Sequence, residues 1–177
     1  MDTPYEKLLA KLARVEVKFI IVGGVAVALN GFVRTTEDVD ILIEASADNV
    51  VRLLDELAHF GDGHARELTA ADFSDSEGSI RIIEDFPLDV FTIIRGKRYA
   101  DLVGTTKTTR IDDFEGRYLN AEGLIALKGD SQRDQDRIDV SALRSLRDND
   151  TPMKPYSAAG VTSLAFHAAS AQSEPAA

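Results

Sequence analysis

Residues 19–44, FIIVGGVAVALNGFVRTTEDVDILIE, constrain the fold more than any other part of this chain. The stretch opens with a continuous apolar run over residues 19–22, which is typical of a strand buried on both faces. The run breaks at Gly23-Gly24 before a short apolar helix, and a second apolar strand then carries Asp38 and Asp40. The stretch therefore predicts a strand, a glycine turn, a helix and a second strand in one unit.

The two aspartates indicate a metal site. Asp38 and Asp40 are two residues apart in an extended segment, so their side chains point to the same face, with Cα atoms roughly 6 to 7 Å apart. Such carboxylates repel unless a divalent cation lies between them, and hard oxygen ligands suit Mg²⁺. The double glycine lets a ligand approach the backbone, and the helix, expected to open at Val25, offers free N–H groups to an anion. The unit therefore predicts a metal site beside a phosphate cradle.

These residues resemble a known signature. An apolar residue before two glycines, followed by an acidic-x-acidic pair on a strand, is similar to the nucleotidyltransferase fold related to DNA polymerase β. Here the pattern reads Val22-Gly23-Gly24 and Asp38-Val39-Asp40. The longer Arg34-x-Thr36-x-Asp38-x-Asp40 resembles the bacterial branch that contains the AbiEii-type nucleotidyltransferase toxins. Many relatives have Gly-Ser at the glycine pair, so a serine hydroxyl for the phosphate is missing here.

The resemblance, which covers about residues 19–143, implies a transferase that uses an NTP as substrate and Mg²⁺ or Mn²⁺ as cofactor. Asp38 and Asp40 would hold the metal ion, and Gly23-Gly24 would lie against the triphosphate. For Arg34 and Thr36 two interpretations stay open. They contact the nucleotide, or they form a strand-edge pair that positions Asp38.

A third acid, Asp89, stands among apolar neighbours in the expected strand over residues 88–94. The resemblance places the third acid of the fold there, beside the acidic pair, where it helps to hold the metal or takes the proton from the attacking hydroxyl. The other interpretation is a strand aspartate that faces water or pairs with an arginine such as Arg81. Both stay open at this point.

The toxin branch also has a late motif, a lysine on one helix followed by Arg-x-Lys-Asp-x-x-Asp on the next. It reads here as Lys128 and then RDQDRID over residues 133–139, with glutamine in place of the second lysine. The resemblance implies that Lys128 and Arg133 bind the triphosphate and that Asp136 and Asp139 are catalytic. The alternatives are a solvated helix lysine and a structural salt-bridge network in which Arg133 is a partner of Asp136.

Other elements follow from local signals. Thr3-Pro4-Tyr5-Glu6 is a capping box with proline at the first helical position, and Ser46 is expected to cap a helix that ends near Gly61. We also expect a polar loop with one helical turn over residues 61–78, a strand over 79–83, a hairpin over 108–119, a helix from Asn120 to Lys128 and another from about 131 to 147.

Composition limits the class of protein. The 177 residues include 44% hydrophobic residues, enough for a real core, and no cysteine, which excludes disulfides and thiolate zinc sites. No apolar run reaches the roughly 18 residues of a membrane helix, and no signal peptide is evident, so we expect a cytoplasmic protein without a membrane partner. The net charge of -10 argues against broad capture of nucleic acid. A local patch around Arg133, Arg137, Arg144 and Arg147 could still hold an RNA end.

The expected fold class is α/β (α+β), a nucleotidyltransferase fold with a small mixed sheet flanked by helices. One domain is expected over residues 1–147, with its core motif at 19–94 and a helical part at 120–147 that closes over the cleft. Residues 148–177 are rich in proline, alanine and serine, and we expect a disordered tail there.

The implied reaction moves a nucleoside monophosphate from an NTP to an acceptor hydroxyl and releases pyrophosphate. Within the resemblance, the acceptor is the 3′ end of tRNA, modified by a toxin with a cognate antitoxin, or a small molecule such as an aminoglycoside, or a protein hydroxyl. A non-catalytic nucleotide-binding module of the same fold is the alternative from another class. The three aspartates Asp38, Asp40 and Asp89 favour the enzyme, because a degenerate enzyme has no reason to keep an unpaired acidic cluster.

Overall fold

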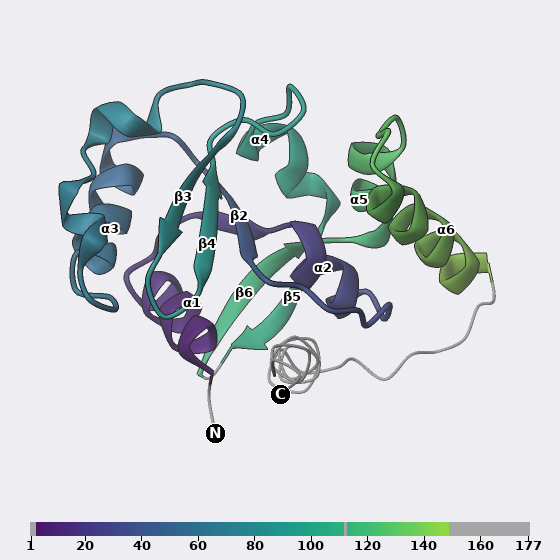
Figure 1. Cartoon of the computed structure of the whole chain (residues 1–177), viewed down its shortest axis with the longest axis horizontal. Helices are drawn as coiled ribbons and strands as arrows, with labels where there is room; N and C mark the ends of the chain where they lie inside the picture. Colours follow the sequence, from purple (N-terminus) through teal and green to yellow (C-terminus); the bar gives the residue numbers. More distant parts are fainter. Residues whose placement is uncertain (1–2, 112, 149–177) are drawn as a thin grey trace, which may run out of the picture.

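The computed structural model describes residues 3–111 and 113–148. Its centre is a six-stranded mixed sheet with the strand order β3-β4-β2-β1-β6-β5 (Figure 1). The expected α/β class, a mixed sheet flanked by helices, is therefore confirmed. The strands are β1 (Phe19–Ile21), β2 (Val39–Ile43), β3 (Ser79–Ile83), β4 (Pro87–Phe91), β5 (Thr106–Ile111) and β6 (Phe114–Leu119).

Helices fill most of the connections. α1 begins with the predicted capping box, in which the Glu6 side chain accepts a hydrogen bond from the Thr3 N–H at 2.8 Å. Asn120 caps α5 by accepting a backbone hydrogen bond. The helices are α1 (Pro4–Arg14), α2 (Gly23–Leu29), α3 (Ala47–Leu57), α4 (Tyr99–Leu102), α5 (Ala121–Lys128) and α6 (Asp134–Asp148), with the 3-10 helices η1 (His64–Glu67), η2 (Ala70–Phe73) and η3 (Val103–Thr105).

The central strands and their helices define the layers. β1 is antiparallel to β2 and parallel to β6, and β2 is parallel to β4. α1 contacts β6 and α3, while α2 contacts β2 and α5. α5 and α6 pack on each other at one end of the molecule (Figure 1). The last two helices therefore lie beside the unit formed by β1, α2 and β2.

The hydrophobic core fixes the orientation of β2. Val39, Ile41 and Ile43 are fully buried on one face of the strand. A slip by one residue would turn Asp40 toward the core in their place. Burial of each aliphatic side chain contributes about 1.5–3 kcal/mol, so the three together hold the strand in this register. Asp40 consequently lies on the opposite face.

Some local predictions need correction. The helix after the glycine pair begins at Gly23 rather than Val25. Ser46 is the N-cap residue of α3, as predicted, but its hydroxyl donates to Glu44 and makes no capping hydrogen bond to the helix. The loop over residues 61–78 contains two 3-10 helices rather than one helical turn. Residues 99–105 form α4 and η3, which were not predicted because elements this short have no apolar period.

Two further expectations concern the ends of the chain and the membrane. The expected tail, apart from Asp148, lies outside the described residues, and the proposed domain boundary stays a prediction. Within residues 3–111 and 113–148, none of the helices has the length and apolar content needed to cross a bilayer.

Candidate active site

The strand register brings two predicted acids side by side. In the parallel pair of β2 and β4, Asp40 is the register partner of Asp89. In the antiparallel pair of β3 and β4, Asp89 is in turn the partner of Arg81. Register partners point to the same face of a sheet, so these three side chains form a row across three strands.

Asp38 joins the row from the position before β2. Arg81 Nη2 lies 2.8 Å from Asp38 Oδ2 and 3.3 Å from Asp89 Oδ2, so one guanidinium bridges two carboxylates. The Thr36 hydroxyl donates to the Asp38 carbonyl at 3.2 Å and lies 3.4 Å from its Oδ1. Asp89 therefore pairs with Arg81, which was one of the two interpretations left open. It also lies in a cluster of three acids with Asp38 and Asp40.

The surroundings of this row shift the pKa values of its carboxyl groups. Burial, and then the negative charges of Asp38 and Asp89, raise the pKa of Asp40 from 3.8 to about 6. The charge of Lys128 and a hydrogen bond from the Gly24 N–H act in the opposite direction. The pKa of Asp89 is also raised, mainly by burial. Carboxyl groups in this state gain the most from a nearby cation.

Close packing explains the glycine pair. A Cβ on Gly23 would lie 1.8 Å from Asp40 Oδ2, and Gly23 has a φ of +59°. A Cβ on Gly24 would lie 2.5 Å from Thr36 Oγ1. Glycine at both positions lets the acidic segment lie directly against the start of α2. Contact of the pair with a triphosphate stays a prediction.

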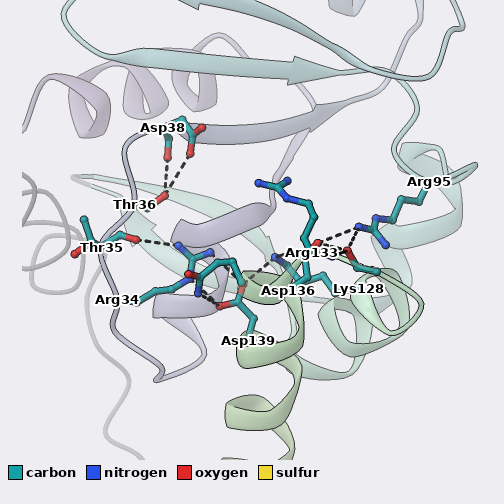
Figure 2. Close-up of polar contacts among 11 residues, drawn as sticks. Arg34, Thr35, Thr36, Asp38, Arg95, Lys128, Arg133, Asp136 and Asp139 are labelled. Carbon is teal, nitrogen blue, oxygen red and sulfur yellow. Dashed lines mark hydrogen bonds and ion pairs between the residues drawn. The ribbon is translucent and has the colours of Figure 1, made fainter.

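A network of charged residues faces the acids (Figure 2). Lys128, the last residue of α5, donates to Asp136 Oδ1 at 2.6 Å and to Asp139 Oδ2 at 2.8 Å. Arg34 donates through Nε and Nη2 to both carboxylate oxygens of Asp139, at 2.7 and 3.0 Å. Lys128 is buried, so it is not a solvated helix lysine. Its two carboxylate partners leave one of its three N–H donors for another contact.

Asp136 ties further segments into this network. Its Oδ2 accepts hydrogen bonds from Ser131 Oγ at 2.6 Å and from Arg95 Nη2 at 3.0 Å. Burial by itself would raise the pKa of Asp136, but hydrogen bonds from Lys128 and Ser131 lower it. The pKa of Asp139 is lowered in the same way, against burial, by its hydrogen bonds to two cations. Both aspartates therefore stay ionised and join α6 to the rest of the domain through ion pairs.

Arg95 and Ser131 are site residues that sequence reasoning missed. Arg95 and Gly96 have φ values of +50° and +70°, and their N–H groups both donate to the Glu77 carboxylate. An arginine-glycine pair after a strand is a turn signal. Nothing in the local sequence indicates that this turn directs the arginine toward Asp136, which lies 41 residues away in the chain.

A cleft of about 720 Å³ separates the acidic strands from the helical network. This volume is typical of a small-molecule site. Phe91, Ile94 and Leu127 add an apolar patch to its polar walls. All predicted site residues line the cleft except Asp139, which is buried against its cationic partners. The residues on the cleft are Gly23, Gly24, Arg34, Thr36, Asp38, Asp40, Asp89, Lys128, Arg133 and Asp136.

Arg133 directs a charge into the cleft. It precedes α6, and its side chain extends toward the part of the cleft that carries Asp38 (Figure 2). Within the described part of the chain, its guanidinium forms no hydrogen bond or ion pair, in contrast to Arg34 and Lys128. The alternative in which Arg133 pairs with Asp136 is therefore wrong, because Lys128, Ser131 and Arg95 occupy that carboxylate.

The acidic row, formed by Asp38, Asp40 and Asp89, is a candidate metal site. Among residues 3–111 and 113–148, no three His, Cys, Asp or Glu side chains are already arranged to hold a metal ion. Asp38, Asp40 and Asp89 nevertheless supply the oxygen donors that Mg²⁺ prefers. The guanidinium of Arg81 already lies between two of them. These oxygen donors thus suit a cation, and the Arg81 guanidinium occupies part of the space between them.

Comparisons with known proteins bear on this site. A family model described as a nucleotidyltransferase of unknown function (DUF6036) matches residues 2–91, which include the three acids of the row and end before Lys128. The chain is also similar to a crystal structure from Thermotoga maritima described as a "putative nucleotidyltransferase", at 17% identity and a TM-score of 0.49, over 84% of this chain and 96% of that one. A search of curated proteins found no match.

Proposed function

This chain belongs to the family of nucleotidyltransferases of unknown function (DUF6036), and we propose that it moves a nucleoside monophosphate from an NTP to an acceptor hydroxyl, releasing pyrophosphate. One observation carries the proposal. Asp38, Asp40 and Asp89 line a cleft into which Lys128 and Arg133 also project. Clustered carboxylates suit a divalent cation and the two cations suit a triphosphate, and nucleotidyl transfer needs both together.

We propose Mg²⁺, or Mn²⁺ in its place, as the cofactor, with Asp38, Asp40 and Asp89 as its ligands. When bound, the ion supplies positive charge to the attacking and leaving oxygens. The raised pKa values of Asp40 and Asp89 support this assignment. Their carboxyl groups carry a cost of ionisation that a bound cation would remove.

The cationic residues have separate proposed roles. Lys128 and Arg133 bind the triphosphate, Lys128 through its remaining N–H donor and Arg133 through a guanidinium that has no partner in the described chain. Asp136 and Asp139, for which the sequence suggested catalysis, act as positioning residues that hold the Lys128 ammonium. Arg34 supports the same network from the segment before β2.

Asp89 is proposed to accept the proton of the acceptor hydroxyl. Asp89 lines the cleft beside Asp40, and the position of a general base is its first requirement. The Ser79 hydroxyl donates to Asp89 Oδ1 at 3.3 Å, which holds the carboxylate in one orientation. This role is compatible with metal binding, since a carboxylate has two oxygens.

For the acceptor, we propose the 3′ end of an RNA, as in toxins of the AbiEii-type branch, which would give this chain a cognate antitoxin as partner. A second groove of about 380 Å³ supports the choice, because it is lined by Arg137 and Arg144 and shares Lys128 with the main cleft. Arginines that lead into the cleft offer contacts to the phosphates of a short RNA end. An aminoglycoside acceptor would carry no phosphates for this groove.

Label transfer tests the proposal. The protein is incubated with Mg²⁺ and each α-³²P NTP, together with total RNA, with aminoglycosides, or without acceptor. The double variant Asp38→Asn/Asp40→Asn removes the metal ligands. Asp113→Asn is the matched control, because that acid is exposed in the turn between β5 and β6.

Each outcome of the label-transfer experiment supports or overturns a stated part of the proposal. Label on small RNA with wild type and Asp113→Asn, and none with the double variant, supports the whole proposal. Label on an aminoglycoside supports nucleotidyl transfer and overturns the RNA acceptor. If no acceptor is labelled while calorimetry detects Mg²⁺-dependent NTP binding, the transfer reaction is overturned in favour of a nucleotide-binding module.

A further inference from the structure

Arg81 places a permanent positive charge inside the acidic row. Its Nη2 lies 2.8 Å from Asp38 Oδ2 and 3.3 Å from Asp89 Oδ2. Because Arg81 is also the register partner of Asp89 across β3 and β4, the folded sheet keeps the two side chains adjacent. A guanidinium does not lose its proton in proteins, so this charge is present at every working pH.

The pair of Arg81 with Asp38 is exposed to solvent, unlike the pairs that Arg34 and Lys128 form with Asp139. The Arg81 side chain is 50% exposed, and exposed ion pairs contribute little to stability. Arg34 and Lys128 are instead held by the fully buried Asp139. The other partner of Arg81, Asp89, is buried, so when the half-exposed Arg81 side chain turns away, that carboxylate needs another cation in its place.

We propose that Arg81 is a built-in competitor for the divalent cation, an inference that rests on the proposed function. Its guanidinium contacts Asp38 and Asp89 and offsets their charge, so a bare cation binds only weakly. Arg81 also lines the cleft, where a triphosphate would offer it new oxygen partners. Nucleotide therefore draws Arg81 off the carboxylates, and metal and nucleotide bind cooperatively.

A titration with Mn²⁺ alone, followed by the electron paramagnetic resonance signal of free Mn²⁺, tests the competition. Arg81→Met removes the charge and keeps much of the side chain, and Arg81→Lys keeps the charge. Arg98→Met is the matched control, because Arg98 is also 50% exposed and pairs with an acid, Asp75, away from the cleft. Thermal unfolding of each variant shows whether it is folded.

We expect Arg81→Met to bind one Mn²⁺ at least about tenfold more tightly than the wild type, since one opposing charge is gone. Arg81→Lys and Arg98→Met should resemble the wild type. Adding Asp89→Asn to Arg81→Met should remove the gain, because a ligand of the ion is then lost.

The titration, repeated with an NTP, separates the two proposals. Equal or weaker Mn²⁺ binding by folded Arg81→Met overturns the competitor role, and the proposed function stands if both proteins still bind Mn²⁺ with NTP. If neither protein binds Mn²⁺ with or without NTP, the metal-dependent function itself is overturned, and the competitor role with it.

Discussion

Asp40 and Asp89 are register partners in the adjacent parallel strands β2 and β4, so the sheet itself holds two carboxylates side by side. On the β1 side, the Val22 N–H donates to the Asp40 carbonyl oxygen at 2.9 Å, which fixes the backbone from both directions. The backbones of the two acids therefore cannot move apart to relieve the repulsion between their side chains. The fold therefore carries an electrostatic cost at this pair, as is common at functional sites.

We expect Asp40→Asn to stabilise the protein at neutral pH. The pKa of Asp40 is raised from 3.8 to about 6. The folded protein therefore binds this proton more tightly than the unfolded chain, and stability falls as pH rises through that window. Above it, the ionised carboxyl costs about 3 kcal/mol, which asparagine avoids. Urea unfolding should show this gain at pH 7 and little of it at pH 4.

The exposed acid Asp113 gives the control for this experiment. Asp113→Asn should match the wild type at both pH values. If Asp40→Asn is no more stable than the wild type at pH 7, ionisation of Asp40 carries no cost, and the electrostatic account of the row is wrong.

Asp139→Asn should have the opposite effect. Asp139 is fully buried and pairs with Arg34 and Lys128, so removing its charge leaves two cations without their shared partner. We expect a loss of about 3 kcal/mol at pH 7. Because hydrogen bonds lower the pKa of Asp139 against the effect of burial, its contribution is present above about 3.8 and disappears as pH falls through the lower folded value.

Urea unfolding of Asp139→Asn at several pH values measures this loss, with Asp134→Asn as the control at the exposed start of α6. The difference from the wild type should shrink toward acidic pH for Asp139→Asn and stay near zero for Asp134→Asn. A loss at pH 7 that is equal in the two variants would mean that the buried network does not hold α6.

The elements around the acidic row could be predicted because their signals are local. An apolar run followed by two glycines marks the end of β1, and apolar residues alternate with acids along β2. The capping box at Thr3 marks the start of α1. Local signals fail where a second partner competes, as at Ser46, whose hydroxyl bonds to Glu44 rather than to the helix.

The contacts between these elements could not be read from periodicity. Alternation along a strand shows which face an acid occupies, but it does not set the register between strands that pairs Asp40 with Asp89. The ion pair of Arg81 with Asp38 spans 43 residues, and that of Arg95 with Asp136 spans 41. Both depend on tertiary packing, so Arg81 was foreseen only as a partner of Asp89, and Arg95 was not foreseen.

Gly23→Ala tests whether the glycine pair serves packing within the protein. A Cβ there would meet Asp40 Oδ2 at 1.8 Å, and the backbone has a φ of +59°. The left-handed conformation alone costs an alanine about 1–2 kcal/mol, and displacing the carboxylate adds to this. Gly104→Ala is the control, because a Cβ there has no atom within 4 Å.

Thermal and urea unfolding should show a loss of at least about 2 kcal/mol for Gly23→Ala and a change within about 0.5 kcal/mol for Gly104→Ala. The double variant Gly23→Ala/Asp40→Gly should recover part of the loss, since the clashing side chain is gone. No recovery would assign the whole effect to backbone conformation.

Arg133→Ala should weaken NTP binding without destabilising the fold. Its guanidinium has no hydrogen bond or ion pair within the described residues and projects into the cleft, so its removal breaks no polar contact among them (Figure 2). A charge-assisted hydrogen bond to phosphate is worth about 1.5–3 kcal/mol, so calorimetry with a non-hydrolysable NTP and Mg²⁺ should show a loss of about 10- to 100-fold.

Arg137→Ala is the matched control, since Arg137 follows one helical turn later, pairs with Asp134 and lines the second groove instead of the main cleft. It should leave NTP affinity unchanged. Equal affinities for the wild type and Arg133→Ala would remove Arg133 from the triphosphate site and leave Lys128 as its cation. Since Lys128 already neutralises two buried aspartates, such a site would bind the triphosphate mainly through the metal ion.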